Sequence, residues 1–184
     1  NCGCTNNMNF RTRYSDIIEE IPDQQRDFER FVPAEGDEDA SLFIIGEAPG
    51  ATEVERGRPF VGRGGNILVD ALNAAGVTRR SVYITNLVKV RPEDNRDPYR
   101  AEIDAWTPLL HAEIQTVSPD VILTLGRIPM NEMIETDARI SDIHGERFDE
   151  GRYCVLPTFH PAATLYDRSR LDPFRKDITE AVRW

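Results

Sequence analysis

The chain has 184 residues, of which 40% are hydrophobic and 8% aromatic, so it is long enough to bury the core of one globular domain. Acidic residues outnumber basic residues by 32 to 22, which gives a net charge of −10, and only Lys89 and Lys176 among the basic residues are lysines. This balance argues against unspecific binding to nucleic-acid phosphates. It favours a halophilic protein, the alternative being an ordinary acidic protein.

No apolar stretch reaches the length of a membrane span, and we expect no signal peptide, because the first residues given are polar and contain no apolar run. We therefore expect a cytoplasmic protein without a membrane partner. The three cysteines are too few for a disulfide framework. Cys2-Gly-Cys4 is weak support for a metal site, and Cys154 lies in an apolar run typical of a buried strand.

Residues 1–40 are polar and acidic, and we expect them to precede a domain of residues 41–184 or to pack on it, with a short helix from Ser15 to Glu20. Within the domain, apolar runs predict these strands: Leu42–Gly46, Val82–Thr85, Val121–Leu125 and Tyr153–Leu156. Apolar residues at helical spacing predict these helices: Asn66–Ala75, Tyr99–Val117, Ile128–Ile134 and Pro173–Trp184. The alternation predicts an α/β fold, a three-layer α/β/α sandwich with a central four-stranded parallel sheet.

Three of the predicted strands end in segments that suit a binding site. The first leads into Gly46–Gly50, the second into Asn86–Lys89 and the fourth into Pro157–Pro161. Because ligands of open parallel sheets bind at the carboxyl ends of the strands, we expect these segments to meet around one site.

Four side chains near these strand ends offer complementary chemistry. Phe60 supplies a ring for stacking, and Asn86 an amide with two donors and an acceptor. His160 supplies a donor, and Glu47 a carboxylate. Each also has an ordinary structural explanation: a core ring, a turn cap, a structural histidine and an ion-pair partner of an arginine. Their occurrence together favours the functional interpretation.

Three segments resemble, in this order, the motifs of family 4 uracil-DNA glycosylases: GEAPGATEVERGRPFVGRGG (Gly46–Gly65), TNLVKVRPEDNRDP (Thr85–Pro98) and TFHPAATL (Thr158–Leu165). The resemblance runs from about residue 41 to the end of the chain. It implies a DNA repair enzyme that flips uracil out of DNA and hydrolyses its N-glycosidic bond, which releases uracil and leaves an abasic site. We expect a monofunctional, monomeric enzyme whose partner is uracil-containing DNA.

The resemblance also implies which residues form the site. The catalytic residues would be Glu47, Glu53 and His160. The base-binding residues would be Ala48, Gly50, Phe60 and Asn86. The DNA-binding residues would be Arg91, Arg96, Leu165 and Arg168, with Leu165 as the wedge that fills the gap left by the flipped nucleotide.

One departure from the family concerns a cofactor. Members normally hold an iron–sulfur cluster through four cysteines. In this chain Val90 stands at the position of the third cysteine and Trp106 at that of the fourth. Cys2 and Cys4 are separated by one residue, whereas the family has two residues between its first pair. We therefore predict that no cluster and no metal is bound, and that Val90 and Trp106 pack where it would sit.

Two other functions remain open at this point. The chain has lost the cluster cysteines, so a non-catalytic protein that binds uracil or damaged DNA on the same fold is one alternative. A glycosylase for another deaminated base is the second, because one sequence does not give the width of the pocket.

Overall fold

The centre of the fold is a six-stranded sheet with the strand order β1-β3-β2-β4-β6-β5, seen in a computed structural model that describes residues 10–184. The strands are β1 (Glu35–Gly36), β2 (Leu42–Gly46), β3 (Tyr83–Asn86), β4 (Val121–Leu125), β5 (Phe148–Asp149) and β6 (Cys154–Thr158). β3, β2, β4 and β6 are parallel, so the predicted central sheet is confirmed. The antiparallel edge strands β1 and β5 were not predicted.

Helices surround this sheet in the alternating order that the sequence predicts. Their bounds are α2 (Ser15–Glu20), α3 (Ala51–Arg56), α4 (Arg63–Ala74), α5 (Arg100–Val117), α6 (Arg127–Met133), α7 (Ile140–Ile143), α8 (Ala163–Tyr166) and α9 (Leu171–Val182). Short 3₁₀ turns lie at η1 (Asp23–Gln25), η2 (Arg79–Ser81), η3 (Glu93–Asn95) and η4 (Arg168–Arg170). The four predicted domain helices correspond to α4, α5, α6 and α9. The short helices α3, α7 and α8 were not predicted.

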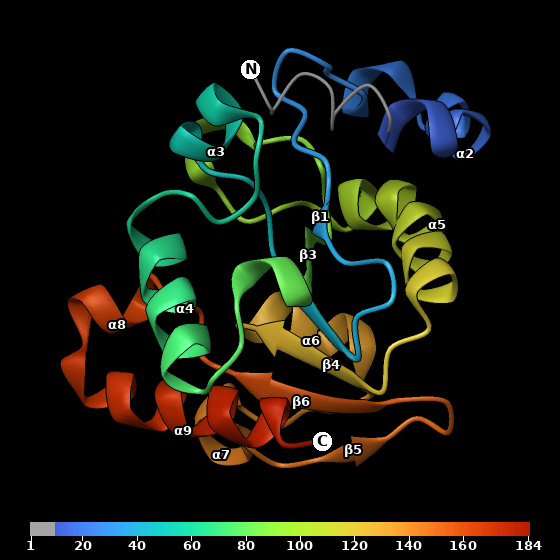
Figure 1. Cartoon of the computed structure of the whole chain (residues 1–184). Helices are drawn as coiled ribbons and strands as arrows, with labels where there is room; N and C mark the ends of the chain where they lie inside the picture. The colour runs from blue at the N-terminus through green and yellow to red at the C-terminus, as the bar shows by residue number, and fades with distance from the viewer. Residues whose placement is uncertain (1–9) are drawn as a thin grey trace.

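The sheet separates two hydrophobic cores, which makes the architecture three-layered (Figure 1). Along β2, Phe43 and Ile45 face the core that α5 covers, whereas Leu42 and Ile44 face the core that α4 and α9 cover. This alternation follows from the period of two in a strand, and both faces are apolar because helices cover both. The predicted three-layer α/β/α sandwich is therefore confirmed.

The described part of the N-terminal segment packs against the α5 side of the sheet. Phe10, Tyr14 and Ile18 are buried in that core. Phe31 forms an antiparallel bridge with Val90, and β1 extends the sheet beside β3. Cys2 and Cys4 lie outside the described residues. No helix within residues 10–184 is both long and apolar enough to cross a bilayer.

Candidate active site

A cavity of about 560 Å³ lies at the carboxyl edge of the parallel strands. β2 and β3 end there side by side, since Gly46 is the register partner of Asn86. The predicted site residues that line the cavity are Glu47, Ala48, Gly50, Glu53, Phe60, Asn86, Arg96, His160 and Leu165. Arg91 and Arg168 are the two predicted residues that do not line it.

Asn86 and Phe60 meet at the floor of this cavity. Asn86 ends β3 and is only 3% exposed, and its side-chain oxygen Oδ1 has no hydrogen-bond partner among the described residues. A Cβ atom on Gly46 would overlap both Oδ1 of Asn86 and the ring of Phe60, so a glycine is required where the two side chains meet. A buried oxygen without a hydrogen bond is energetically costly, and a ligand with a hydrogen-bond donor could supply the missing bond to Oδ1.

His160 follows β6, and its ring centroid lies 6.1 Å from that of Phe60. Burial lowers the pKa of His160 to about 4, against an opposing effect of Glu53, so the imidazole is neutral at neutral pH. The backbone N–H of Ala162 donates to Nδ1 of His160 at 3.2 Å. Since Nδ1 accepts this bond, the neutral ring has its proton on Nε2 and can donate from there.

Glu47 is the first residue after β2 and is half-buried in the cavity wall. Burial is the main cause that raises the pKa of its carboxyl group to about 7, and the charge of Asp97 adds to it, whereas Arg127 opposes it. A carboxyl group with a pKa near neutrality can accept or hold a proton under ordinary conditions, which suits acid–base chemistry.

Glu53 on α3 holds the loop that contains Phe60. One of its carboxylate oxygens accepts hydrogen bonds from the backbone N–H of Val61 at 3.0 Å and from that of Gly62 at 2.7 Å. The predicted second catalytic carboxylate therefore has one oxygen committed to the backbone.

The predicted DNA-contacting residues lie at different places. Leu165 is 37% exposed at the mouth of the cavity, beside Tyr166, which is 91% exposed. Arg96 forms a two-bond ion pair with Glu102, at 2.7 and 2.8 Å. Arg91 donates to Asn95 at 2.8 Å and lines a neighbouring cavity, and Arg168 is exposed on η4.

The residues at the expected cluster positions do not fit an iron–sulfur group. Trp106 is 1% exposed with its ring 5.9 Å from that of Phe31, and Val90 packs against the same core. Neither is a thiolate, and Cys154 lies in the core on the opposite face of the sheet. Within residues 10–184, no three His, Cys, Asp or Glu side chains are placed to hold a metal ion.

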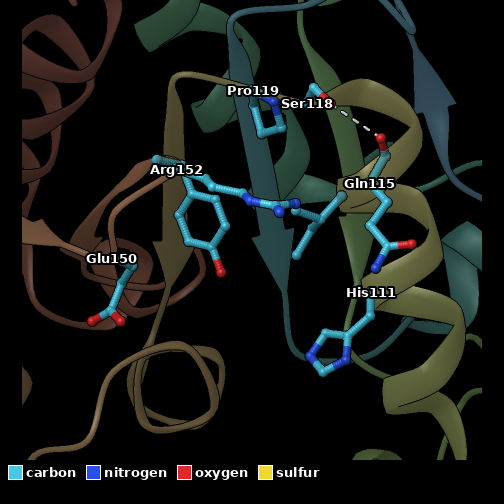
Figure 2. A pocket seen from close by; sticks show the side chains of 8 residues that line it. His111, Gln115, Ser118, Pro119, Glu150 and Arg152 are labelled. Carbon is cyan, nitrogen blue, oxygen red and sulfur yellow. Dashed lines mark hydrogen bonds between the residues drawn. The ribbon is translucent and has the colours of Figure 1, made fainter.

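A second cavity, of about 470 Å³, lies away from these residues (Figure 2). It is lined by His111 and Gln115 of α5, by Ser118 and Pro119 before β4, and by Tyr153 before β6. These positions are at the amino edge of the parallel strands, opposite the edge where ligands of such sheets bind. The hydrogen bond drawn in Figure 2, from Ser118 Oγ to the Gln115 carbonyl, closes the end of α5.

Several residues of the site were missed by the sequence interpretation. Asp97 and Arg127 act on Glu47, and Tyr166 lies at the cavity mouth. Arg79 on η2 contacts the backbone of the Phe60 loop. The pattern of a strand followed by a loop indicates the site residues at the strand end. It does not indicate which residues of distant segments contact them.

Comparison with known proteins matches the region that contains the cavity. A family model described as Uracil DNA glycosylase superfamily matches residues 33–183. The type-4 uracil-DNA glycosylase of Saccharolobus solfataricus is 41% identical over 83% of this chain and 73% of its own. The enzyme of the same type from Pyrobaculum aerophilum is 40% identical over 80% of this chain and 79% of its own. The one from Archaeoglobus fulgidus is 33% identical over 89% of this chain and 88% of its own.

Proposed function

The chain belongs to the uracil-DNA glycosylase superfamily, and from this membership we propose that it removes uracil from DNA by hydrolysing the N-glycosidic bond. The observation that supports this most is one cavity lined by Phe60, Asn86 and His160, in which the amide oxygen of buried Asn86 has no partner within residues 10–184. The product is an abasic site and free uracil, and the enzyme is monofunctional.

Recognition of the base falls to Asn86 and Phe60. The amide of Asn86 can accept the N3–H of uracil with Oδ1 and donate to its O4 with Nδ2. This assignment pairs the atom that is otherwise unpaired. The ring of Phe60 stacks on the flipped base, and the backbone of Ala48 and Gly50 lines the pocket around it.

Cleavage of the bond develops negative charge on the base and positive charge on the sugar. His160 donates from Nε2 to uracil O2, and this hydrogen bond strengthens as the charge develops. Glu47 in its carboxylate form orients the attacking water and stabilises the cationic sugar. Glu53 shares the site as a second negative charge while its hydrogen bonds keep the Phe60 loop in place.

Contacts with DNA surround this pocket. Leu165 is partly exposed at the cavity mouth and acts as the wedge in the base stack. Arg91, Arg96 and Arg168 contact phosphates. Arg96 must exchange part of its ion pair with Glu102 to do so.

The remaining properties follow from the same chain. We propose that no iron–sulfur cluster is bound, and the support is that Trp106 and Val90, at two of the expected cysteine positions, are not thiolates. A monomer is sufficient for this activity, because one chain supplies the ring, amide, imidazole and carboxylate that the mechanism uses. It is halophilic, as its acidic composition suggests. We propose the cytoplasm as the compartment in which it meets DNA.

The test is release of uracil from an end-labelled oligonucleotide that contains one uracil. Alkali then cleaves the strand at each abasic site, and the assay is repeated from about 0.1 to about 2 M KCl because charge screening changes over this range. We expect cleavage at the uracil with the native chain, and none with an oligonucleotide that has thymine at that place.

The outcomes separate the alternatives. Retention of the uracil oligonucleotide without release of base, at every salt concentration, would identify a binding protein. Release of hypoxanthine in preference to uracil would identify another base as the substrate. Iron and sulfide analysis of the purified chain tests the absence of the cluster independently.

A further inference from the structure

Phe60 has a backbone conformation that an aromatic residue rarely adopts. Its φ angle is +50°, in the left-handed region that normally belongs to glycine. The conformation brings the Phe60 ring to Asn86 and His160, and it is costly by itself. Such a conformation persists only when the surrounding structure holds it.

The holding group on one side of the Phe60 loop is Arg79. Its guanidinium donates to the carbonyl oxygen of Phe60 at 2.9 Å and to that of Pro59. Arg79 lies on η2, 19 residues after Phe60 and 20 after Pro59. Its side chain is 13% exposed. A planar guanidinium can bind two adjacent carbonyls at once, which a lysine ammonium does less well.

Glu35 orients Arg79. A carboxylate oxygen of Glu35 accepts from Arg79 at 3.3 Å and from Nε of Arg58 at 2.9 Å. Burial raises the pKa of Glu35, but the hydrogen bonds and charges of Arg58 and Arg79 outweigh burial and hold the pKa below its ordinary value. Glu35 is therefore ionised, and it comes from β1, outside the predicted domain of residues 41–184.

The opposite side of the loop is held by Glu53 and by α4. The N–H groups of Val61 and Gly62 donate to Glu53. A Cβ atom on Gly65 would overlap the carbonyl of Phe60, so α4 closes the loop from behind. The carbonyls before and at Phe60 and the N–H groups after it thus bind two side chains of opposite charge.

We propose that Arg79, oriented by Glu35, is a positioning residue that keeps Phe60 in its left-handed conformation so that the ring can stack on the base. Without Arg79 the peptide after Phe60 relaxes toward the common backbone regions, and the ring leaves its place beside Asn86. This inference rests on the proposed function for its effect on activity, whereas its effect on the Phe60 ring is independent of any substrate.

The variant that tests it is Arg79→Ala, with Arg80→Ala as the matched control. Arg80 is the next residue of the same turn and is exposed, so the control removes the same charge and chain length. Glu35 keeps Arg58 as a partner in the Arg79→Ala variant, which avoids an unpaired buried charge. Arg79→Lys keeps the charge without the two-carbonyl geometry and should recover only part of the function.

The rate of single-turnover uracil release is measured with and without Arg79→Ala, first in the native chain and then in the Phe60→Ala variant. We expect a loss of about 10- to 100-fold with Phe60 present, as for a displaced contact group. We expect less than about a 2-fold change in the Phe60→Ala background, because residues that act through one another are not additive. An equal loss in both backgrounds, or no loss with Phe60 present, would overturn the proposal.

The second readout needs no substrate. The chain is labelled with 4-fluorophenylalanine, and the fluorine resonance of Phe60 is identified by its disappearance in Phe60→Leu. We expect Arg79→Ala to shift or broaden this resonance and Arg80→Ala to leave it unchanged. An inactive native chain would refute the proposed function alone, and an unmoved resonance in Arg79→Ala would refute the positioning role alone.

Discussion

The amide of Asn86 is buried at the end of β3, and its oxygen is unpaired in the described part of the chain, which is an unfavourable state for the free protein. Binding sites often leave a polar group in this state so that the correct ligand completes it and a wrong ligand does not. The hydrogen-bonding edge of uracil fits this requirement because it offers a donor beside an acceptor.

We predict that Asn86→Asp lowers kcat/KM for the uracil oligonucleotide by at least about 100-fold, the usual size of loss for a preorganised hydrogen-bonding group. A carboxylate repels O4 of uracil and cannot donate to it. The same change at Asn73, an exposed residue of α4, is the control and should leave the rate unchanged. Equal activity of Asn86→Asp and the native chain would remove Asn86 from base recognition.

Glu47 acts as a carboxylate in the proposed mechanism, so its raised pKa should be visible in the pH dependence of the rate. With a pKa of about 7, the group gains its charge as the pH rises through neutrality, and activity should rise with it. The part of the pH profile in which the rate rises is its acid limb. The charges next to Glu47 determine the pH at which this limb lies.

We predict that Asp97→Asn moves the acid limb to lower pH, because it removes a negative charge that raises the pKa of Glu47. Arg127→Gln should move the limb to higher pH, because it removes the opposing positive charge. Single-turnover rates at low ionic strength give the profile, with Asp94→Asn as the control. If the acid limb moved in the same direction in Asp97→Asn and in Arg127→Gln, its assignment to Glu47 would be contradicted.

The carboxyl end of β3 is held by a buried ion pair between Lys89 and Glu113 of α5. Nζ of Lys89 donates to Glu113 at 2.6 Å, to the Asn86 carbonyl at 2.8 Å and to Thr85. Both side chains are almost fully buried. The pair therefore ties Asn86, which we propose to read the base, to the helix behind the sheet.

We predict that Lys89→Met lowers the free energy of unfolding by about 3–5 kcal/mol, because it leaves Glu113 as an unpaired buried group. Adding Glu113→Gln should recover most of this loss, since the neutral amide still bonds to Thr85. Lys176→Met changes the other lysine, which is exposed, and should alter stability by less than about 0.5 kcal/mol. Urea denaturation measures all three, and a double variant less stable than Lys89→Met would contradict the pairing.

The strands show what a sequence pattern can and cannot predict. β2 and β4 have the predicted bounds, because a run of at least three large apolar residues that follows a polar turn forms a clear signal. β1 and β5 have two residues each, which is too short for any periodic pattern, and they pair only because β3 and β6 offer free edges. Their positions depend on tertiary contacts.

The site divides in the same way. Phe60, Asn86 and His160 were predictable because each lies in a motif next to a strand end. Arg79 and Glu35 were not, because they act on backbone carbonyls through contacts between β1, η2 and the Phe60 loop. No spacing in the sequence encodes a hydrogen bond between side chain and backbone across such separations.

The net charge of −10 affects the stability of the folded chain as well as its approach to DNA. Like charges on a compact molecule repel, and dissolved salt screens this repulsion between exposed charges that lie farther apart than the Debye length, which is about 3 Å at 1 M. Contacts with phosphates weaken as salt rises, because the release of counterions into a more concentrated salt solution is less favourable. The two effects act on activity in opposite directions.

We predict that the melting temperature rises as KCl is increased from about 0.1 to about 1 M, and that uracil release is fastest at an intermediate concentration. A variant with the exposed acids Glu55, Asp70 and Glu135 changed to their amides is the control. Its melting temperature should be higher at low salt and should depend less on KCl, because part of the repulsion is already absent. If native chain and variant gain equally from salt, the stabilisation would be a general solvent effect and not the screening of these carboxylates.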